Sequence, residues 1–506
     1  MLPQTLQLIP KPQKIEMREG SFEVSGKTSI SAAPGLSLFK TMLKSTFAES
    51  AGARTRCDQA NEVMLALDPD LNRLGEEGYL LDIQPEKLTL SAHSEKGLFY
   101  GIQTVRQILL TSAQGMLPCL MIEDAPRLAW RGLMLDEGRH FFGKAFVKKF
   151  IDLLALYKMN TFHWHLTEDQ GWRIEIKKYP QLTSVGSKRA ESPIEGDRTN
   201  GDGLPYEGFY TQEDIRELVA YASDRFINIV PELEMPGHAA AAIAAYPEYG
   251  NVDIQDYRPE VKTRWGVHHY TYSPTEETFQ FLENIIQEVT SLFPGKYFHI
   301  GGDEAPKDQW KGSPIAQNIM RANGLNDEHE LQSYFIRRVE RILNKHGRTL
   351  VGWDEIQEGG LSPTATMMVW RDKKWATLAL QNGNSIVMAH EKDTYFDHYQ
   401  ADPSENKEPE AIGGLLPLEK VYAFDPVMEG LTPEQEKCVL GVQAQLWSEY
   451  LFNAEKVEYM AFPRMCAFAE VAWTKVENKS YEDFLARLKG NLALLDRMQV
   501  NYRNPF

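Results

Sequence analysis

Tyr297 to Glu304 read Tyr-Phe-His-Ile-Gly-Gly-Asp-Glu, and this stretch contains the pattern on which the chain is built. Its aromatic and branched first residues are typical of a buried strand. Gly301 and Gly302 permit the turn that follows and let a ligand approach the backbone. Neighbouring residues on a strand point to opposite faces of the sheet. Asp303 and Glu304 can therefore reach the same ligand only if they lie on the turn beyond the strand. An acidic loop after a core strand is the alternative interpretation.

Eight runs along the chain share this form: a short apolar segment ends in polar or aromatic residues, and most are followed by a helical segment. Strands that alternate with helices indicate parallel βαβ units, and eight of them predict an α/β fold of the (β/α)8 TIM-barrel type. Active sites of such barrels lie at the C-terminal ends of the strands. The eight runs are Arg131–Arg139, Thr161–Asp169, Ile227–His238, Tyr297–Glu304, Thr349–Glu355, Met367–Asp372, Ser385–Asp397 and Gly441–Glu449. The helical segments include Phe146–Met159, Thr211–Phe226, Glu276–Phe293 and Glu328–His346.

The first 125 residues have a different organisation. Gly78–Ile83 and Lys87–Ala92 read as strands around a turn, and Leu98–Leu110 has apolar residues at helical spacing. A break at Asp124-Ala125-Pro126 marks a domain boundary. We therefore expect a small α/β accessory domain over 1–125 and the barrel over 126–506, closed by a C-terminal helix within Tyr481–Val500.

The composition excludes some partners. A chain of 506 residues has room for a barrel and an accessory domain, and its net charge of −17 argues against nucleic acid or an anionic membrane as partner. No apolar run approaches the roughly 20 residues of a membrane span, and the N-terminus lacks the pattern of a signal peptide. The sequence leaves the oligomeric state, the compartment and the pairing of the cysteines open. The cysteines are far apart, at Cys57, Cys119, Cys438 and Cys466.

The adjacent carboxylates suggest acid catalysis. Cleavage of a glycosidic bond needs a carboxylic acid that protonates the leaving oxygen, and Glu304 is the candidate. A neighbouring carboxylate such as Asp303 is expected to raise its pKa. The common retaining scheme needs a second carboxylate about 5 to 5.5 Å away, across the sugar ring. Adjacent residues on one turn are poorly placed for that, which favours a substrate that supplies its own nucleophile.

Three tryptophans stand near the ends of separate strand-like runs. Indoles that converge at a barrel mouth could wall a pyranose ring and exclude water, although each could also be core packing. These residues are Trp353, Trp370 and Trp447.

Other polar residues fall at strand ends. Arg139 could clamp vicinal hydroxyls or pair with a neighbouring carboxylate. His238 could couple to an acid or be a satisfied core histidine. Tyr395 and Asp397 are two residues apart, so on an extended segment they share a face and could bind a polar ligand; a common turn is the alternative.

An alternative reaction class follows from His163-Trp164-His165. Alternate strand histidines share a face, which is how the metal site of amidohydrolase barrels begins, and His238 and His390 could complete it. His390, however, precedes the end of its run.

With these residues assembled, the chain closely resembles the β-N-acetylhexosaminidases of glycoside hydrolase family 20 over nearly its whole length. The first 125 residues resemble the family's accessory domain. The barrel carries the family's motifs in order, as RGLMLDEGRHF, FHWHLTEDQGWR, PELEMPGH, HIGGDE, GWDE, TYFD and LWSE.

The resemblance implies exo-acting, retaining release of a terminal β-linked GlcNAc or GalNAc from a glycan, with an oxazolinium intermediate formed by the substrate's acetamido group. It implies no metal and no cofactor, and it suggests an exported enzyme. Glu304 would be the acid and then the base, Asp303 would orient the acetamido group, and His238 would support the acid. The other implied roles are Tyr395 on the acetamido oxygen, the three tryptophans around the sugar, Arg139 on O3 and O4, and Asp397 and Glu449 on the O4/O6 edge.

Two departures from the family pattern bear on specificity. Glu168 and Glu234 stand where the family often has Asp, so the buried carboxylate–histidine network is expected to be arranged differently. The interval 403–426 lacks a further tryptophan that some members carry there, and Gly413 and Gly414 occupy the region. The outer wall is thus expected to be more open. Relatives that act on 6-O-sulfated sugars or release a disaccharide, and a non-catalytic sugar-binding protein, are the alternatives.

Overall fold

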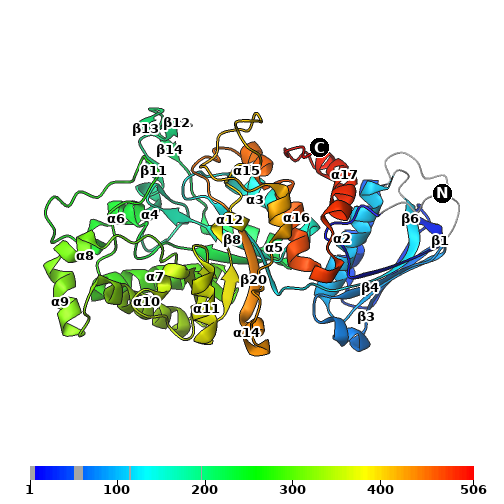
Figure 1. Cartoon of the computed structure of the whole chain (residues 1–506), viewed down its shortest axis with the longest axis horizontal. Coiled ribbons are helices and arrows are strands. Elements are labelled where there is room, and N and C mark those ends of the chain that lie inside the picture. Colours follow the sequence, from blue (N-terminus) through cyan, green and yellow to red (C-terminus); the bar gives the residue numbers. More distant parts are fainter. Residues whose placement is uncertain (1–5, 51–60, 113–115, 195–196) are drawn as a thin grey trace.

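The computed structural model of the chain describes residues 6–50, 61–112, 116–194 and 197–506. Figure 1 shows an N-terminal sheet at one end of the molecule and a barrel with its surrounding helices at the other. The predicted α/β fold, a (β/α)8 barrel preceded by an α/β domain, is confirmed.

The N-terminal part is a six-stranded sheet in the order β1-β6-β4-β5-β3-β2. Helix α2 packs against β4, β5, α1 and α17 (Tyr481–Arg497), and its side chains are buried almost all round, as its apolar residues at helical spacing lead one to expect. The predicted strands and helix of this part are therefore confirmed. Its strands are β1 (Lys14–Glu23), β2 (Ser29–Ala32), β3 (Glu62–Leu67), β4 (Tyr79–Ile83), β5 (Lys87–Ala92) and β6 (Met116–Asp124), and its helices are α1 (Ser37–Ser50), η1 (Pro69–Leu74) and α2 (Glu95–Thr111).

Eight parallel strands close the barrel in the order β15-β16-β17-β18-β19-β20-β7-β8. Each lies within one of the eight runs predicted from the sequence, or overlaps it. The strands are β7 (Trp130–Asp136), β8 (Thr161–His165), β15 (Asn228–Glu232), β16 (Tyr297–His299), β17 (Thr349–Trp353), β18 (Thr366–Val369), β19 (Ile386–Met388) and β20 (Val439–Leu446).

Helices surround the barrel, and the four predicted helical segments are found. The longer helices are α3 (Gly143–Leu156), α5 (Gln212–Ser223), α7 (Glu276–Leu292), α9 (Pro314–Ala322), α10 (Glu328–Lys345), α11 (Lys373–Gln381), α15 (Ala454–Ala461), α16 (Arg464–Trp473) and α17 (Tyr481–Arg497). The shorter ones are α4 (Gln181–Ser184), α6 (Ala240–Ala245), η2 (Pro247–Tyr249), α8 (Asp308–Gly312), η3 (Asp354–Gln357), α12 (Glu391–Thr394), α13 (Leu418–Ala423), α14 (Pro433–Cys438) and η4 (Val476–Asn478).

The connection from β8 to β15 is the longest excursion that carries strands of its own. Its short strands pair with one another, and β11 to β14 lie at the side of the barrel where α4 and α6 also lie (Figure 1). These strands are β9 (Thr167–Glu168), β10 (Gly171–Trp172), β11 (Lys188–Arg189), β12 (Pro193–Ile194), β13 (Asp197–Gly201) and β14 (Tyr206–Glu207).

The period of two along each strand decides what fills the barrel. On β17, Leu350 packs toward the helices, whereas Val351 and Trp353 belong to the interior cluster. On β8, Phe162 and Trp164 face the helices, which leaves His163 and His165 on the inner face. The interior of this barrel therefore holds charged groups as well as apolar ones.

The C-terminal helix α17 packs against α2 of the N-terminal part, so the end of the chain joins the two parts (Figure 1). We propose that the chain divides between residues 125 and 126. Cys119, Cys438 and Cys466 are free thiols, and Cys57 lies outside the described residues. Within the described part of the chain, no helix has both the length and the apolar composition needed to cross a membrane.

Candidate active site

The turn after β16 has the form that the glycine pair predicts. Gly301 and Gly302 have φ values of 68° and 90°, a region that favours glycine. A Cβ on Gly301 would lie 1.8 Å from Oε2 of Glu234, so no side chain fits there. Glu304 itself has a φ of 43°, which an ordinary residue adopts only when its surroundings enforce it. The turn thus places Asp303 and Glu304 together beyond the strand, as predicted.

A cavity of about 320 Å³ opens at the C-terminal ends of the strands. Every residue predicted for the site lines it except His238, which lies behind the two acidic residues. Gly413 and Gly414 form part of its rim, at the position where the sequence predicts a more open wall. The lining residues from the prediction are Arg139, Asp303, Glu304, Trp353, Trp370, Tyr395, Asp397, Trp447 and Glu449.

Aromatic rings form one continuous wall of this cavity. The Trp353 and Trp447 rings lie 5.6 Å apart, and the Trp370 ring stacks on Tyr395 at 6.2 Å with an interplanar angle of 20°. The Trp370 indole donates to Glu355 at 2.9 Å, which fixes its edge. Such a wall suits the apolar C–H face of a sugar ring.

His238 connects the acidic pair to the interior. Its Nε2 lies 3.6 Å from Asp303 Oδ2 and 3.5 Å from Glu304 Oε2. Its Nδ1 lies 2.7 Å from Glu168 Oε1 and 3.2 Å from Asp169 Oδ2. Although burial opposes a charge on the ring, Glu168 and Asp169 hold the pKa of His238 well above its usual value. The histidine is therefore a buried cation behind two carboxylates of the cavity.

The other end of the cavity combines a guanidinium with carboxylates. Arg139 pairs with Glu168 at 3.2 Å, with Asp136 at 3.3 Å and with Glu449 at 3.7 Å, and it lies over the Trp447 ring. The ion pairs confirm one alternative for Arg139, and because it also faces the cavity, the clamp on ligand hydroxyls stays a prediction. Oδ1 of Asp397 and Oε2 of Glu449 are buried without a partner among the described residues. These oxygens can accept hydrogen bonds from ligand hydroxyls.

Comparison with known proteins places this geometry in a family. A family model described as "Glycosyl hydrolase family 20, catalytic domain" matches residues 128–476, and "Glycosyl hydrolase family 20, domain 2" matches residues 5–125. The chain belongs to glycosyl hydrolase family 20. Its class is that of glycoside hydrolases of the β-N-acetylhexosaminidase type.

Individual relatives agree with this family. The chain is 44% identical to a beta-hexosaminidase of Porphyromonas gingivalis over 99% of its own length and 64% of the relative's. It is 34% identical to a beta-hexosaminidase of Akkermansia muciniphila, over 87% of this chain and 88% of the relative. A solved exo beta-N-acetylglucosaminidase of Vibrio harveyi, in complex with N-acetylglucosamine, matches with a TM-score of 0.88 and 35% identity, over 99% of this chain and 79% of that one.

In this family 20 chain, the pKa shifts of Asp303 and Glu304 differ from the sequence prediction, which expected a raised pKa for Glu304. The hydrogen bond to His238 lowers the pKa of Glu304, so the predicted upward shift is wrong. Burial instead raises the pKa of Asp303 to about 6, and neighbouring carboxylates add to this shift. The reason is geometric: the side chain of Glu304 is 44% exposed, whereas that of Asp303 is 12% exposed and lies above other carboxylates.

A second cavity, of about 380 Å³, adjoins the first through Glu449. Its wall includes the aromatic residues Tyr206, Trp265, Tyr450 and Phe452. It contains neither Asp303 nor Glu304, so we assign the family's chemistry to the smaller cavity.

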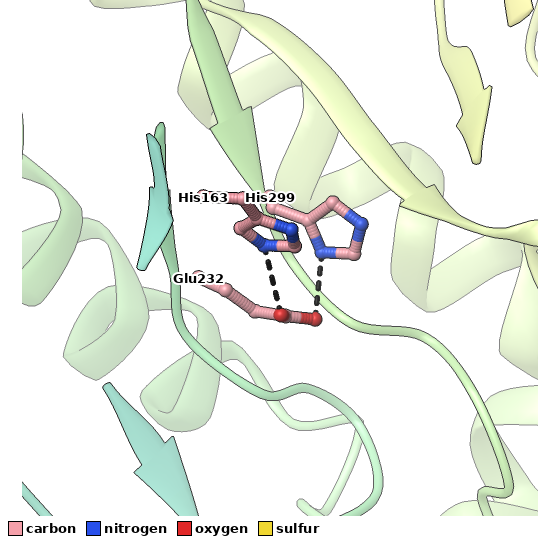
Figure 2. A group of neighbouring side chains, drawn as sticks. All are labelled: His163, Glu232 and His299. Atoms are coloured by element: carbon pink, nitrogen blue, oxygen red, sulfur yellow. Dashed lines mark ion pairs between the residues drawn. The ribbon is translucent and has the colours of Figure 1, made fainter. Parts of the chain in front are cut away.

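The histidines of the interior bear on the metal-dependent alternative. His163 Nε2 lies 2.9 Å from Glu232 Oε2, and His299 Nδ1 lies 2.7 Å from Oε1 of the same carboxylate. Figure 2 shows both rings on one side of Glu232, each directed at a different oxygen. His165 bridges Asp136 and Glu234, at 2.9 Å to each.

Hydrogen bonding around His163 decides its tautomer. The Trp130 indole donates to Gln443 Oε1 at 3.3 Å, so the Gln443 amide nitrogen faces His163 Nδ1, at 2.8 Å. Nδ1 is therefore the acceptor, and Nε2, which lies 2.9 Å from Glu232 Oε2, carries the proton. His390, the other proposed ligand, pairs with Asp393 at 2.7 Å. A protonated nitrogen cannot bind a cation, so Nε2 of His163 is not a metal ligand in this arrangement.

Sequence reasoning missed two acidic residues of this region. Glu355 anchors Trp370, and burial with the nearby Asp303 raises its pKa to about 8. Glu232 lies beneath the cavity and accepts from the Trp353 indole at 2.9 Å. Each stands at or near the end of a predicted strand run, which is the signal that could have found it.

Proposed function

We propose that this chain is an exo-acting, retaining β-N-acetylhexosaminidase that releases terminal β-linked GlcNAc or GalNAc from glycans by substrate-assisted catalysis. One observation carries the proposal: Asp303 and Glu304 share one turn, contact the same histidine and face a cavity walled by three indoles. Adjacent carboxylates do not flank a sugar ring at the spacing of an acid and a protein nucleophile. The names of the relatives support the same activity.

In the first step, Glu304 donates its proton to the glycosidic oxygen while the acetamido oxygen of the substrate attacks the anomeric carbon. The bond from that carbon to the leaving oxygen breaks, and an oxazolinium ion forms. A bound sugar covers the exposed side chain of Glu304 and desolvates it, which raises its pKa toward that of an acid.

Asp303 and Tyr395 act on the acetamido group. The Asp303 carboxylate accepts a hydrogen bond from the acetamido N–H and stabilises the positive charge that develops there. The Tyr395 hydroxyl donates to the acetamido oxygen and directs it at the anomeric carbon. Burial holds the pKa of Tyr395 well above its usual value, so it remains a donor.

In the second step, the Glu304 carboxylate takes a proton from a water molecule that attacks the anomeric carbon from the face the leaving group vacated. The oxazolinium opens, the acetamido group is restored, and the sugar leaves with its original anomeric configuration. The charge of His238 favours the ionised Glu304 that this step needs.

The sugar's hydroxyl edge would be held by Arg139, Asp397 and Glu449. We propose an unsulfated sugar, because a carboxylate at this edge repels a sulfate. Burial and the nearby Arg464 lower the pKa of His398 to about 4, so this ring is neutral near pH 7 and offers a sulfate no charge.

The test is hydrolysis of 4-nitrophenyl β-N-acetylglucosaminide in the presence and absence of a thiazoline mimic of the oxazoline. The proposal expects hydrolysis, strong competitive inhibition by the thiazoline and product of retained configuration by NMR. If the thiazoline does not inhibit hydrolysis, a nucleophile from the protein must act instead of the acetamido group. A 6-O-sulfated and a disaccharide glycoside, assayed in parallel, decide between the proposed substrate and the alternatives.

A further inference from the structure

Glu232 is a buried carboxylate that the proposed mechanism does not use. It ends β15, one side of its carboxylate faces the imidazoles of β8 and β16, and the Trp353 indole from β17 donates to it (Figure 2). Its side chain is fully buried. Two imidazoles and one indole from three different strands thus converge on one carboxylate.

Glu232 is surrounded by groups that favour its charge. Nε2 of His163 lies 2.9 Å from its Oε2, and the indole of Trp353 can only donate. His299 Nδ1 accepts from the Gly301 amide at 3.1 Å and lies 2.7 Å from Glu232 Oε1. Although burial opposes the charge, the imidazoles of His299, His165 and His163 hold the pKa of Glu232 well below its usual value.

This anion lies close to the proposed site of charge stabilisation. Oxygen atoms of Glu232, Glu234 and Asp303 lie within 4.8 Å of one another. Burial and the other two carboxylates raise the pKa of Glu234 well above its usual value. This shift favours the neutral form of Glu234, whereas the neighbouring imidazoles favour the charged form of Glu232.

We propose that Glu232 is a positioning residue for this reaction: it holds the Trp353 indole in the cavity wall and fixes a negative charge beneath Asp303. The inference rests on the proposed role of Asp303. A like charge below makes the Asp303 carboxylate a stronger hydrogen-bond acceptor for the acetamido N–H and adds to the field that favours the oxazolinium cation.

Other titratable groups also act on the carboxylates of Glu232 and Asp303, and the substitutions of Glu232 leave these groups unchanged. His165, which lies 3.9 Å from Glu232, is paired between Asp136 and Glu234. The titratable groups that face Asp303 are Glu168 after β8, Glu232, Glu234 and His238 on and after β15, Glu304 on its own turn, Glu355 after β17 and Tyr395 after β19.

The test compares Glu232→Gln and Glu232→Asp with the wild-type chain in the pH dependence of kcat/KM on 4-nitrophenyl β-N-acetylglucosaminide. Glu232→Gln removes the charge, so we expect the acidic limb to move down by about one pH unit. Loss of the field should lower kcat about tenfold or more, although the amide oxygen of Gln can still accept from the Trp353 indole. Glu232→Asp keeps the charge but is too short to reach the indole, so kcat should fall while the acidic limb stays.

The matched control is Glu340→Gln on α10, another buried carboxylate, which binds Ser362 and Thr364 far from the cavity. Glu340→Gln should lower the stability of the folded chain without moving the acidic limb of the pH profile of kcat/KM. An unmoved limb in Glu232→Gln would overturn the inference, because a purely structural residue lowers activity equally at every pH. If Glu232→Gln does not fold, Glu232→Asp decides, and a wild-type kcat in that variant overturns the inference. An active Asp303→Asn would instead defeat the proposed function.

Discussion

Asp303→Asn is the most informative perturbation of this site. The substitution keeps the shape and one hydrogen-bond acceptor but removes a charge. A hydrogen-bonded oxazolinium would hold its positive charge about 4 Å from the carboxylate, where two unit charges interact by about 4 kcal/mol at an effective dielectric constant of 20 and by about 1 kcal/mol in bulk water. The Asp303 side chain is 12% exposed, so the first figure applies. A change of 1.36 kcal/mol in activation free energy corresponds to a tenfold change in rate. Because Asn still makes a weaker hydrogen bond to the acetamido group, we expect a loss of about 10²- to 10³-fold in kcat/KM.

The assay is steady-state hydrolysis of the chromogenic glycoside between pH 4 and 9. Burial raises the pKa of Asp303 to about 6, and the ionised form is the active one. Ionisation of Asp303 should therefore give wild-type kcat/KM an acidic limb that falls as the pH drops through about 6, while loss of the proton of Glu304 limits the rate at higher pH. In Asp303→Asn this limb should vanish. Asp308→Asn, an exposed acid at the start of α8 that pairs with His269, is the control and should behave like wild type. A loss below tenfold, or a limb that persists in the Asn variant, would refute the reasoning.

Three further predictions concern single groups. Glu304→Gln should lower kcat by about 10²- to 10⁴-fold on 4-nitrophenyl glycosides and less on a dinitrophenyl glycoside, whose leaving group needs no acid; equal losses would contradict acid catalysis. Tyr395→Phe should lower kcat/KM about 10- to 100-fold by removing a donor to a charged group, and an unchanged thiazoline Ki would argue against that contact. Gly301→Ala should lower the free energy of unfolding by about 2 to 4 kcal/mol in urea titrations, because a left-handed φ and a clash with Glu234 add. A wild-type midpoint would show that the turn can relax.

Much of the fold could be predicted because its signals are local. Each barrel strand is a short apolar run followed by polar residues, and helices such as α7 and α10 carry their apolar residues at a period of 3.6. The left-handed turn at Gly301 and Gly302 is equally local, since only glycine adopts it without strain. Chain order and the rule that parallel barrels place their sites at the strand ends then bring the candidate residues together.

The sequence by itself therefore determined the barrel, the turn and the set of residues at its mouth. Only the tertiary structure decided how those residues are charged. His238 approaches Glu304 from another strand end and lowers its pKa, where a rise was expected. Burial instead raises the pKa of Asp303. Glu232 meets the indole of β17 and the imidazoles of β8 and β16 only after the barrel has closed. The physical reason is that solvation and electrostatic interactions depend on distances in space between residues far apart in the chain, whereas strand, helix and turn propensities depend on neighbours in sequence.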